Sequence, residues 1–266
     1  MNSLREIERL VLENSEKEDR VVQGIWSVDC LFNPVGNGRV FDYKFLVAQT
    51  AAGQGCSYST HHDYSAEDLK LYIGSDFTDF HNTDAALKVA FLDAVYGTLF
   101  PPKQVKRLEK SADSITKMRW RTQIIMDEAI RLLGDVKGKR IVNIGVVGDI
   151  LNTFSAAGAD IFGSDYDPSI IGNLDVPVID GDSTLDAVKE SELAIVTGMT
   201  VTTNTIDSIL ECAVKNGVKV IVFAETAANF ASFYLSRGVD VYLSEHFPFY
   251  IFSGASAIDV CYREGQ

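Results

Sequence analysis

Positively charged residues are scarce in this sequence. Its 266 residues include 24 Lys and Arg against 37 Asp and Glu, which gives a formal net charge of −13 at pH 7. A protein of that sign repels the phosphates of nucleic acids and anionic lipids, and no basic stripe along a predicted helix offsets the excess. We therefore expect a small-molecule substrate or ligand, and neither a nucleic acid nor a membrane as a partner.

Long apolar runs and paired cysteines are missing too. No stretch approaches the roughly 18–20 apolar residues of a membrane helix, and residues 1–20 are charged throughout, unlike a secretory signal. The four cysteines, Cys30, Cys56, Cys212 and Cys261, form no C-x-x-C pair, so neither a disulfide framework nor a thiolate zinc site is indicated. We expect a cytoplasmic protein with free thiols.

The first part of the chain mixes strand and helix patterns. A helix with one apolar face precedes two β-rich stretches, and the turn between them is rich in Pro, Gly and Asn, which predicts a hairpin. A third strand and two helices follow. The predicted elements are a helix at residues 4–13, strands at 21–32, 39–50 and 56–60, and helices at 65–73 and 83–99. Residues 1–103 are therefore predicted to form a small α+β domain.

The second part changes character. Residues 104–138 are predicted to be a helical connector, because apolar residues recur there at helical spacing. Beyond it, short apolar runs alternate with helices, and parallel strands need such crossovers. The predicted strands lie at residues 140–144, 160–163, 194–197, 218–224 and 239–243. The predicted fold class is thus α/β, with a Rossmann-like parallel-sheet domain at residues 139–266 preceded by the smaller α+β domain.

The first strand of the Rossmann-like domain runs into a loop with two glycines. Gly145 and Gly148 allow backbone to approach a ligand where a helix begins, and Asp149 follows in its first turn. The next strand ends in Asp165, 20 residues after Gly145, where Rossmann folds place the acid that binds a ribose diol. A tight packing turn would explain the two glycines alone. The complete order predicts a site for an adenosine-type cofactor.

The string GSDYDPS at residues 163–169 resembles the second strand end of S-adenosylmethionine methyltransferases. The resemblance implies that Asp165 binds the ribose and that Tyr166 flanks the adenine. Asp182, after a third apolar stretch, would continue the rim, or else lies in a solvated turn. The third glycine of the dinucleotide fingerprint is missing, which disfavours the pyrophosphate of NAD.

Polar residues crowd the end of the predicted strand at residues 194–197. Ligands in open α/β sheets bind at the carboxyl ends of the strands, so we expect Thr197, Thr200 and Asn204 to contact substrate or cofactor. One residue of this segment could instead cap the helix that follows. A cap requires a single polar side chain, and this segment has several.

Two further strand ends carry ionisable residues. Glu225 follows one strand, and His246 follows another, where a histidine can act as a general base near neutral pH or simply hydrogen-bond. The pair His61-His62 suggests a metal site, but adjacent residues on a strand point to opposite faces. No metal ligand is therefore predicted.

A family resemblance covers nearly the whole chain. The polar segment at residues 197–206, and the small-residue helix pattern at residues 86–94, resemble the DUF364 and DUF4213 proteins. Those pair an enolase-N-terminal-like domain with a Rossmann-like domain and are provisionally regarded as heavy-metal chelation proteins. The family's Phe-Pro and Gly-Pro-Ser strings are replaced here by Gly148-Asp149-Ile150 and Ala224-Glu225-Thr226. The organisation also resembles archaeal enzymes that use S-adenosylmethionine to methylate a pyridinol precursor of the iron-guanylylpyridinol cofactor.

These patterns favour an S-adenosylmethionine-dependent methyltransferase acting on a small heterocyclic cofactor precursor of the pyridinol type. Methyl transfer needs two reactants held close and aligned, which suits a chain without an evident catalytic triad. The alternatives are a non-catalytic metal or small-ligand binder of the DUF364 type and an NAD-linked oxidoreductase. The predicted catalytic residues are Thr197, Thr200, Glu225 and His246, and the predicted cofactor-binding residues are Gly145, Gly148, Asp149, Asp165, Tyr166, Asp182 and Asn204. We expect a homodimer, the commonest oligomer.

Overall fold

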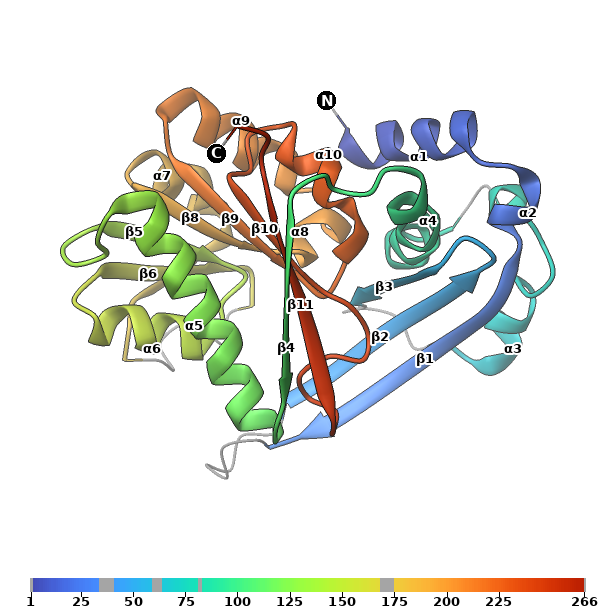
Figure 1. The fold of residues 1–266 in the computed structure, drawn as a ribbon, viewed down its shortest axis with the longest axis horizontal. Coiled ribbons are helices and arrows are strands. Elements are labelled where there is room, and N and C mark those ends of the chain that lie inside the picture. The colour runs from blue at the N-terminus through green and yellow to red at the C-terminus, as the bar shows by residue number, and fades with distance from the viewer. Residues whose placement is uncertain (1, 34–40, 59–63, 81–82, 168–174, 266) are drawn as a thin grey trace.

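The computed structural model describes residues 2–33, 41–58, 64–80, 83–167 and 175–265. They form two modules, a three-stranded sheet with its helices and a larger sheet flanked by helices (Figure 1). The turn of the predicted hairpin and the pair His61-His62 lie outside the described residues. None of the described helices is long and apolar enough to cross a bilayer.

The N-terminal module is built as the sequence predicts. Its strands β1 and β2 form an antiparallel hairpin, and β3 pairs with β2. The helix α4 covers this sheet and ends at Leu99, two residues before Pro101. The elements are α1 (Ser3–Asn14), α2 (Lys17–Arg20), β1 (Val22–Phe32), β2 (Phe41–Thr50), β3 (Gln54–Tyr58), α3 (Ala66–Lys70), η1 (Phe77–Asp79) and α4 (Ala85–Leu99).

The helix α4 is apolar on all sides because it is enclosed on all sides. One side packs on β2 and β3, where an added Cβ at Gly55 would lie 2.2 Å from the carbonyl oxygen of Ala90. Another side meets the second module, with the ring of Tyr96 5.4 Å from that of Phe230. The two modules therefore share one apolar core through this helix.

The second module contains an eight-stranded sheet in the order β4-β11-β10-β9-β8-β5-β6-β7. Taken in chain order, its six parallel strands, from β7 at one edge to β10, follow the Rossmann arrangement 3-2-1-4-5-6. The elements are β4 (Val105–Ser111), α5 (Ser114–Leu133), β5 (Arg140–Ile144), α6 (Gly148–Ala156), β6 (Asp160–Asp165), β7 (Val178–Asp180), η2 (Gly181–Ser183), α7 (Thr184–Lys189), β8 (Leu193–Thr197), α8 (Met199–Thr202), α9 (Ile206–Asn216), β9 (Lys219–Ala224), η3 (Ala228–Phe230), α10 (Ala231–Leu235), β10 (Val241–Glu245) and β11 (Ala255–Tyr262).

Successive side chains of the central strands point to opposite faces of the sheet. Ile141 and Ile195 pack beneath α5 and α6. Val142 and Val196 pack beneath α7, α9 and α10 in the core that α4 joins. The fold class predicted from the sequence, α/β with a Rossmann-like sheet domain after a smaller α+β domain, is confirmed.

The prediction that residues 105–111 are helical is wrong. They form the edge strand β4, which pairs antiparallel with β11, a strand that the pattern did not predict. Six of the seven residues of β4 are exposed, so no buried face marks the segment in the sequence. Its conformation depends on β11, about 150 residues away in the chain, and local propensity gives way to that pairing. Residues 114–133 form the helix α5, as predicted.

Candidate functional site

The strands β5 and β8 lie side by side at the topological switch point of the sheet. From β5 the chain proceeds to β6 on one side, and from β8 it proceeds to β9 on the other. In Rossmann folds, connections that leave in opposite directions create a crevice at the carboxyl ends of the two strands, and ligands bind in it. The glycine loop follows β5, and Thr197 ends β8. We call the region around Gly145, Asp165 and Thr197 the switch-point crevice.

Gly145 is required at its position for two reasons. Its φ is +74°, in the left-handed region that glycine adopts without strain. An added Cβ would also lie 2.3 Å from Oγ1 of Thr197. The backbone N–H of Gly145 donates to the carbonyl of Ser164 at 3.0 Å, which ties the loop to the end of β6.

Thr197 carries a buried hydroxyl that lacks a hydrogen-bond partner. The residue is only 7% exposed, and no described group bonds its Oγ1. An unsatisfied buried hydroxyl costs roughly 1–3 kcal/mol. Thr200 differs, because its Oγ1 donates to the carbonyl of Thr197 at 2.7 Å. Of these two predicted catalytic threonines, Thr197 has the free hydroxyl, and it lies against the glycine loop.

Asn143 holds the glycine loop in place and was not predicted. It is fully buried in β5. Its Oδ1 accepts from the N–H of Val147 at 2.9 Å, and its Nδ2 donates to the carbonyl of Ile195 at 3.2 Å. One side chain therefore links the loop to β8. The available signal was a single amide within the apolar run RIVNI.

Asp165 lies beside the glycine loop, as the spacing predicts. Its Oδ2 accepts from the N–H of Val146 at 2.8 Å, and its Oδ1 accepts from the N–H of Asp167 at 3.0 Å. Each carboxylate oxygen has two acceptor positions. The residue is half-buried, so it can order the loop and still accept a hydrogen bond from a ligand hydroxyl.

The helix α6 begins at Gly148 without a side-chain cap. The first amides of a helix have no partner within it, so this end can bind an acceptor group of a ligand. Asp149 lies in the first turn, and its Oδ2 accepts from the Thr122 hydroxyl of α5 at 2.5 Å. The carboxylate of Asp149 is thus committed to α5, although its negative charge remains near the helix start.

Three predicted cofactor-binding residues lie at exposed positions. Tyr166 is 61% exposed, and its ring covers Gly181, where an added Cβ would lie 2.6 Å from the ring. Asp182 is exposed in η2. Asn204 is exposed with a φ of +57° in the turn between α8 and α9, where its N–H donates to the carbonyl of Val201. Tyr166 therefore presents an open aromatic face beside Asp165, whereas Asn204 forms a turn.

The N-terminal module reaches the same edge of the sheet through β3. The N–H of Tyr58 donates to Oγ1 of Thr226 at 2.8 Å, and the hydroxyls of Ser57 and Thr202 lie 3.2 Å apart. Burial raises the pKa of Tyr58, and the carboxylates of Asp42, Asp167 and Asp165 raise it further. Residues of both modules therefore surround this edge.

Glu225 and Glu245 share one buried arginine. Nη1 of Arg121, on α5, lies 2.5 Å from Oε1 of Glu225 and 3.3 Å from Oε2 of Glu245. Its guanidinium also lies 4.3 Å from the ring centre of Tyr250. Burial raises the pKa of Glu225 to about 7 although Arg121 opposes the shift. Burial disfavours the charge of Arg121, and the two carboxylates outweigh that effect and raise its pKa.

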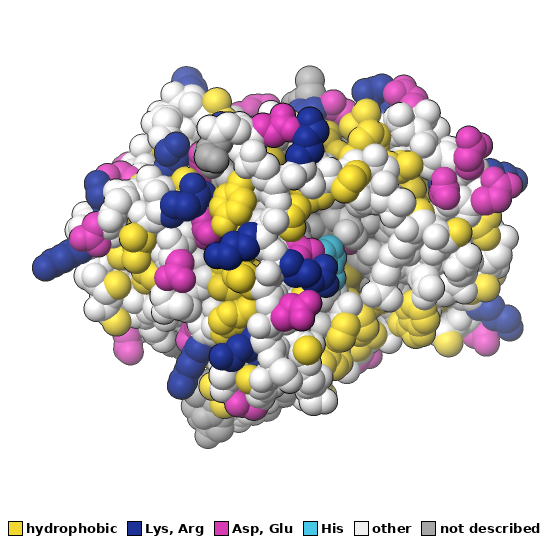
Figure 2. Space-filling model, viewed as in Figure 1, with side chains coloured by type: hydrophobic (Ala, Val, Ile, Leu, Met, Phe, Trp, Pro, Cys, Tyr) yellow, Lys and Arg dark blue, Asp and Glu magenta, His cyan; other side chains and the backbone are white. Residues whose placement is uncertain are grey.

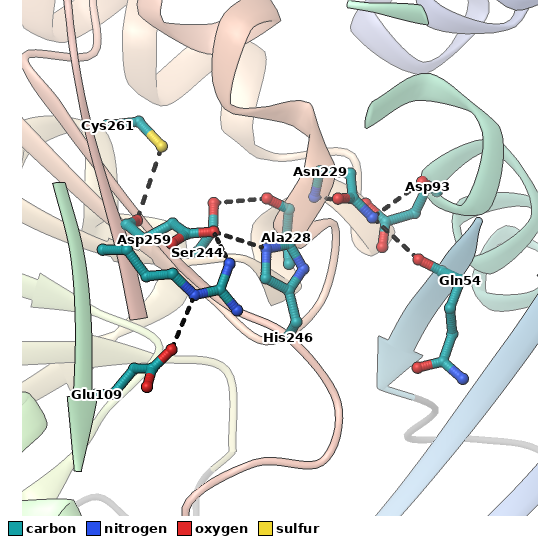
Figure 3. A network of polar contacts seen from close by, with 10 residues as sticks. Gln54, Asp93, Glu109, Ala228, Asn229, Ser244, His246, Asp259 and Cys261 are labelled. Atoms are coloured by element: carbon teal, nitrogen blue, oxygen red, sulfur yellow. Dashed lines mark hydrogen bonds and ion pairs between the residues drawn. The ribbon is translucent and has the colours of Figure 1, made fainter. Parts of the chain in front are cut away.

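His246 lies just after β10 and close to Asp259 of β11. Its Nε2 is 3.4 Å from Oδ2 of Asp259, which also lies 3.4 Å from Nη1 of Arg107. The hydrogen bond from His246 lowers the pKa of Asp259. Figure 3 shows the second nitrogen of His246 pointing away from Asp259, toward Asn229 and Asp93. A carboxylate that orients a histidine in this way leaves the other ring nitrogen available to a ligand.

Seven of the eleven predicted site residues therefore fall into two groups. Gly145, Gly148, Asp165 and Thr197 surround the switch-point crevice, with Tyr166 at its rim. Glu225 and His246 lie one and two strands beyond β8 along the same edge, after β9 and β10. No group of three or more His, Cys, Asp and Glu within the described ranges is arranged to hold a metal ion.

Comparison with known proteins shows similarity of fold. No protein-family model matches the sequence, and no curated protein matches it. A DUF364 family protein of unknown function from Desulfitobacterium hafniense DCB-2 has a TM-score of 0.62 at 12% identity, covering 98% of this chain and 100% of that one. A DUF364 protein of unknown function from Pyrococcus horikoshii has a TM-score of 0.55 at 13% identity, with coverages of 97% and 98%. The resemblance in fold to DUF364 proteins is thereby confirmed.

Proposed function

We propose that this protein is an S-adenosylmethionine-dependent methyltransferase that acts on a small heterocyclic acceptor. The cofactor would lie in the switch-point crevice, and the acceptor would lie along the strand edge toward Glu225 and His246. When bound, S-adenosylmethionine supplies an electrophilic methyl group on a sulfonium sulfur. The residues of the chain would hold the two reactants in line, which is the main requirement of such a transfer.

The observation that carries this proposal is the unpartnered hydroxyl of Thr197 beside the glycine loop. A buried hydroxyl without a partner is uncommon in a native protein and calls for an explanation. A polar ligand group in the crevice would supply that partner. The uncapped start of α6 offers backbone N–H groups to a ligand oxygen, and Asp165 offers acceptor oxygens to a ribose.

The charge around the crevice favours a cofactor without phosphate groups. Asp149 lies in the first turn of α6, the place where a dinucleotide pyrophosphate would bind. Asp165 and Asp167 add two more carboxylates nearby. A pyrophosphate would meet like charge there, whereas a sulfonium and an ammonium group would meet opposite charge. The negative charge around the crevice therefore favours S-adenosylmethionine over NAD.

The acceptor side of the proposed site can exchange a proton. Burial raises the pKa of Glu225, toward the range in which general acid–base groups work at neutral pH. His246 is oriented by Asp259 and has one ring nitrogen free of that contact. Either group would take the proton that a hydroxyl or N–H acceptor loses.

Calorimetry with S-adenosylhomocysteine tests the proposal directly. We expect saturable binding, weakened about tenfold by Thr197→Val and retained by Thr197→Ser, because one hydrogen bond is worth about 1 kcal/mol or somewhat more. Both variants are small changes at the same buried position, so they form a matched pair. Absence of binding at millimolar ligand would overturn the proposal. If such a preparation bound an added divalent metal instead, the non-catalytic alternative would take its place.

A further inference from the structure

A second space opens where the two modules meet. It has a volume of about 190 Å³, far above the roughly 10–15 Å³ that one water requires. Figure 2 shows a hollow between the modules with a histidine at its rim. His246 is the histidine of its lining. We call this space the interdomain cavity, and its polar lining is formed by Gln54, Cys56, Asp93, Glu225 and His246.

Asp93 is the member of this lining that nothing above has used. It is the single acidic residue of the apolar helix α4 and is 1% exposed. Its Oδ2 accepts from the N–H of Cys56 at 3.0 Å, and its Oδ1 accepts from the N–H of Asn229 at 2.8 Å. One amide belongs to each module. Within the described residues, no Lys or Arg pairs with Asp93, and His246 is the nearby group whose charge would favour its ionisation.

The balance of charge around the cavity is negative. Asp93 and Glu225 line it, and Glu245 lies behind Glu225. The single guanidinium of Arg121 is shared between the two glutamates. Two carboxylates therefore line the cavity, and the guanidinium that pairs with one of them is shared with a third carboxylate outside the lining. Burial raises the pKa of Asp93 to about 7, which reflects a carboxylate that lacks a cation.

The lining is also rich in hydrogen-bond acceptors. The carboxylates of Asp93 and Glu225 accept when ionised. Nε2 of His246 is directed at Asp259, and in the neutral ring that carries its proton on Nε2, Nδ1 is an acceptor that points toward Asn229 and Asp93 (Figure 3). A ligand that matches three acceptors and a negative charge must carry N–H donors and a positive charge.

We propose that the interdomain cavity binds a small organic cation with N–H donors, of the protonated amino-heterocycle or amidinium class, between Asp93, Glu225 and His246. The identification of this cation as the methyl acceptor rests on the proposed function. The cation site itself does not. Glu225 would take part in both, because it lies at the strand end that separates the cavity from the switch-point crevice.

The test uses 4-aminopyridine, a cation at neutral pH, and aniline, a neutral ring of the same size. Ligand-observed NMR with the full chain should give saturable binding of 4-aminopyridine and at least tenfold weaker binding of aniline. Asp93→Asn should lower the affinity for 4-aminopyridine at least fivefold. Asp127→Asn is the matched control, because it removes the same charge from the exposed face of α5 and should leave the affinity unchanged.

Glu225→Gln provides a second variant in case Asp93→Asn does not fold. It should also lower the affinity for 4-aminopyridine at least fivefold. Equal binding of the two rings, or unchanged affinity in both cavity variants, would overturn the cation site. Binding of S-adenosylhomocysteine is measured on the same samples. If it binds while 4-aminopyridine does not, only this inference fails. If 4-aminopyridine binds and S-adenosylhomocysteine does not, the proposed cation site is supported and the proposed methyltransferase function is overturned.

Discussion

The switch-point crevice and the interdomain cavity lie along one edge of the sheet but are built from different materials. The crevice is mostly backbone, with the glycine loop, the uncapped start of α6 and one free hydroxyl at Thr197. The cavity is mostly ionisable side chains, among them Asp93, Glu225 and His246. Backbone groups carry no titratable charge. The crevice should therefore depend on shape, and the cavity should depend on pH.

The two regions also differ in how the chain assembles them. Gly145 and Asp165 belong to one β-α-β unit, and Asn143 orders the loop from within the first strand. The cavity needs α4 and β3 of one module and two strand ends of the other. A change in the packing of the modules would consequently alter the cavity first.

The largest expected effect concerns the shape of the crevice. Gly145→Ala introduces a residue at a φ of +74° and a Cβ 2.3 Å from the Thr197 hydroxyl. We expect S-adenosylhomocysteine binding to fall at least a hundredfold in calorimetry, because the loop must move. Gly134→Ala is the matched control, since Gly134 has a φ of +79° and no neighbour within 4 Å of an added Cβ. It should cost about 1–2 kcal/mol of stability and leave binding intact. Equal loss of binding in both variants would contradict the role of shape.

The next effect concerns the charge of the cavity. Asp93 has an ordinary pKa of 3.8 and a folded-state pKa of about 7. Because the folded value is the higher one, its contribution to stability is present below pH 4 and is lost as the pH rises to 7. His246, Glu225, Cys56 and Tyr242 are the ionisable groups that face it.

Urea unfolding of wild type and Asp93→Asn checks this expectation. The free energy of unfolding of Asp93→Asn, taken relative to that of wild type, should rise by on the order of 2–3 kcal/mol between pH 5 and pH 8. The asparagine stays neutral, whereas the aspartate must ionise in a buried place. A difference between the two proteins that does not change with pH would show that Asp93 is already matched by a cation.

A smaller effect is expected from the anchor of the glycine loop. Asn143→Leu keeps the number and branching of the side-chain heavy atoms and removes the hydrogen bonds to Val147 and Ile195. The unsatisfied backbone groups should cost about 1–3 kcal/mol in unfolding experiments. S-adenosylhomocysteine affinity should fall about tenfold, and 4-aminopyridine affinity should not change. Loss of both affinities would mean that the two regions are not independent.

The crevice was predictable from the sequence because its parts are local. An apolar strand, two glycines, a helix and an acid 20 residues later define a single supersecondary unit whose geometry is nearly fixed. The cavity was not, because residues 93, 225 and 246 meet only when the two modules pack. Glu225 and His246 were found as strand ends, but nothing placed Asp93 opposite them. The edge strand β4 was missed for the same reason, since its partner β11 is distant in the chain.

Some of the missed residues did leave a mark in the sequence. Asn143 interrupts the apolar strand β5, and Asp93 interrupts the apolar helix α4. Burial of a polar group is costly without a partner, so a lone polar residue in an apolar element predicts that a partner exists. It does not predict which one. The partner comes from another element, and only the three-dimensional structure identifies it.

The smallest expected effect would sharpen the contrast at the rim of the crevice. Tyr166 is 61% exposed and its ring covers Gly181, so its removal should change stability by less than about 0.5 kcal/mol. If the ring stacks on adenine, Tyr166→Ala should weaken S-adenosylhomocysteine about fivefold, in line with about 1 kcal/mol for a stacked aromatic pair. Tyr166→Phe keeps the ring and should bind like wild type. An alanine variant with unchanged affinity would instead remove Tyr166 from the cofactor site, and Asp165 would then be the sole contact on that strand end.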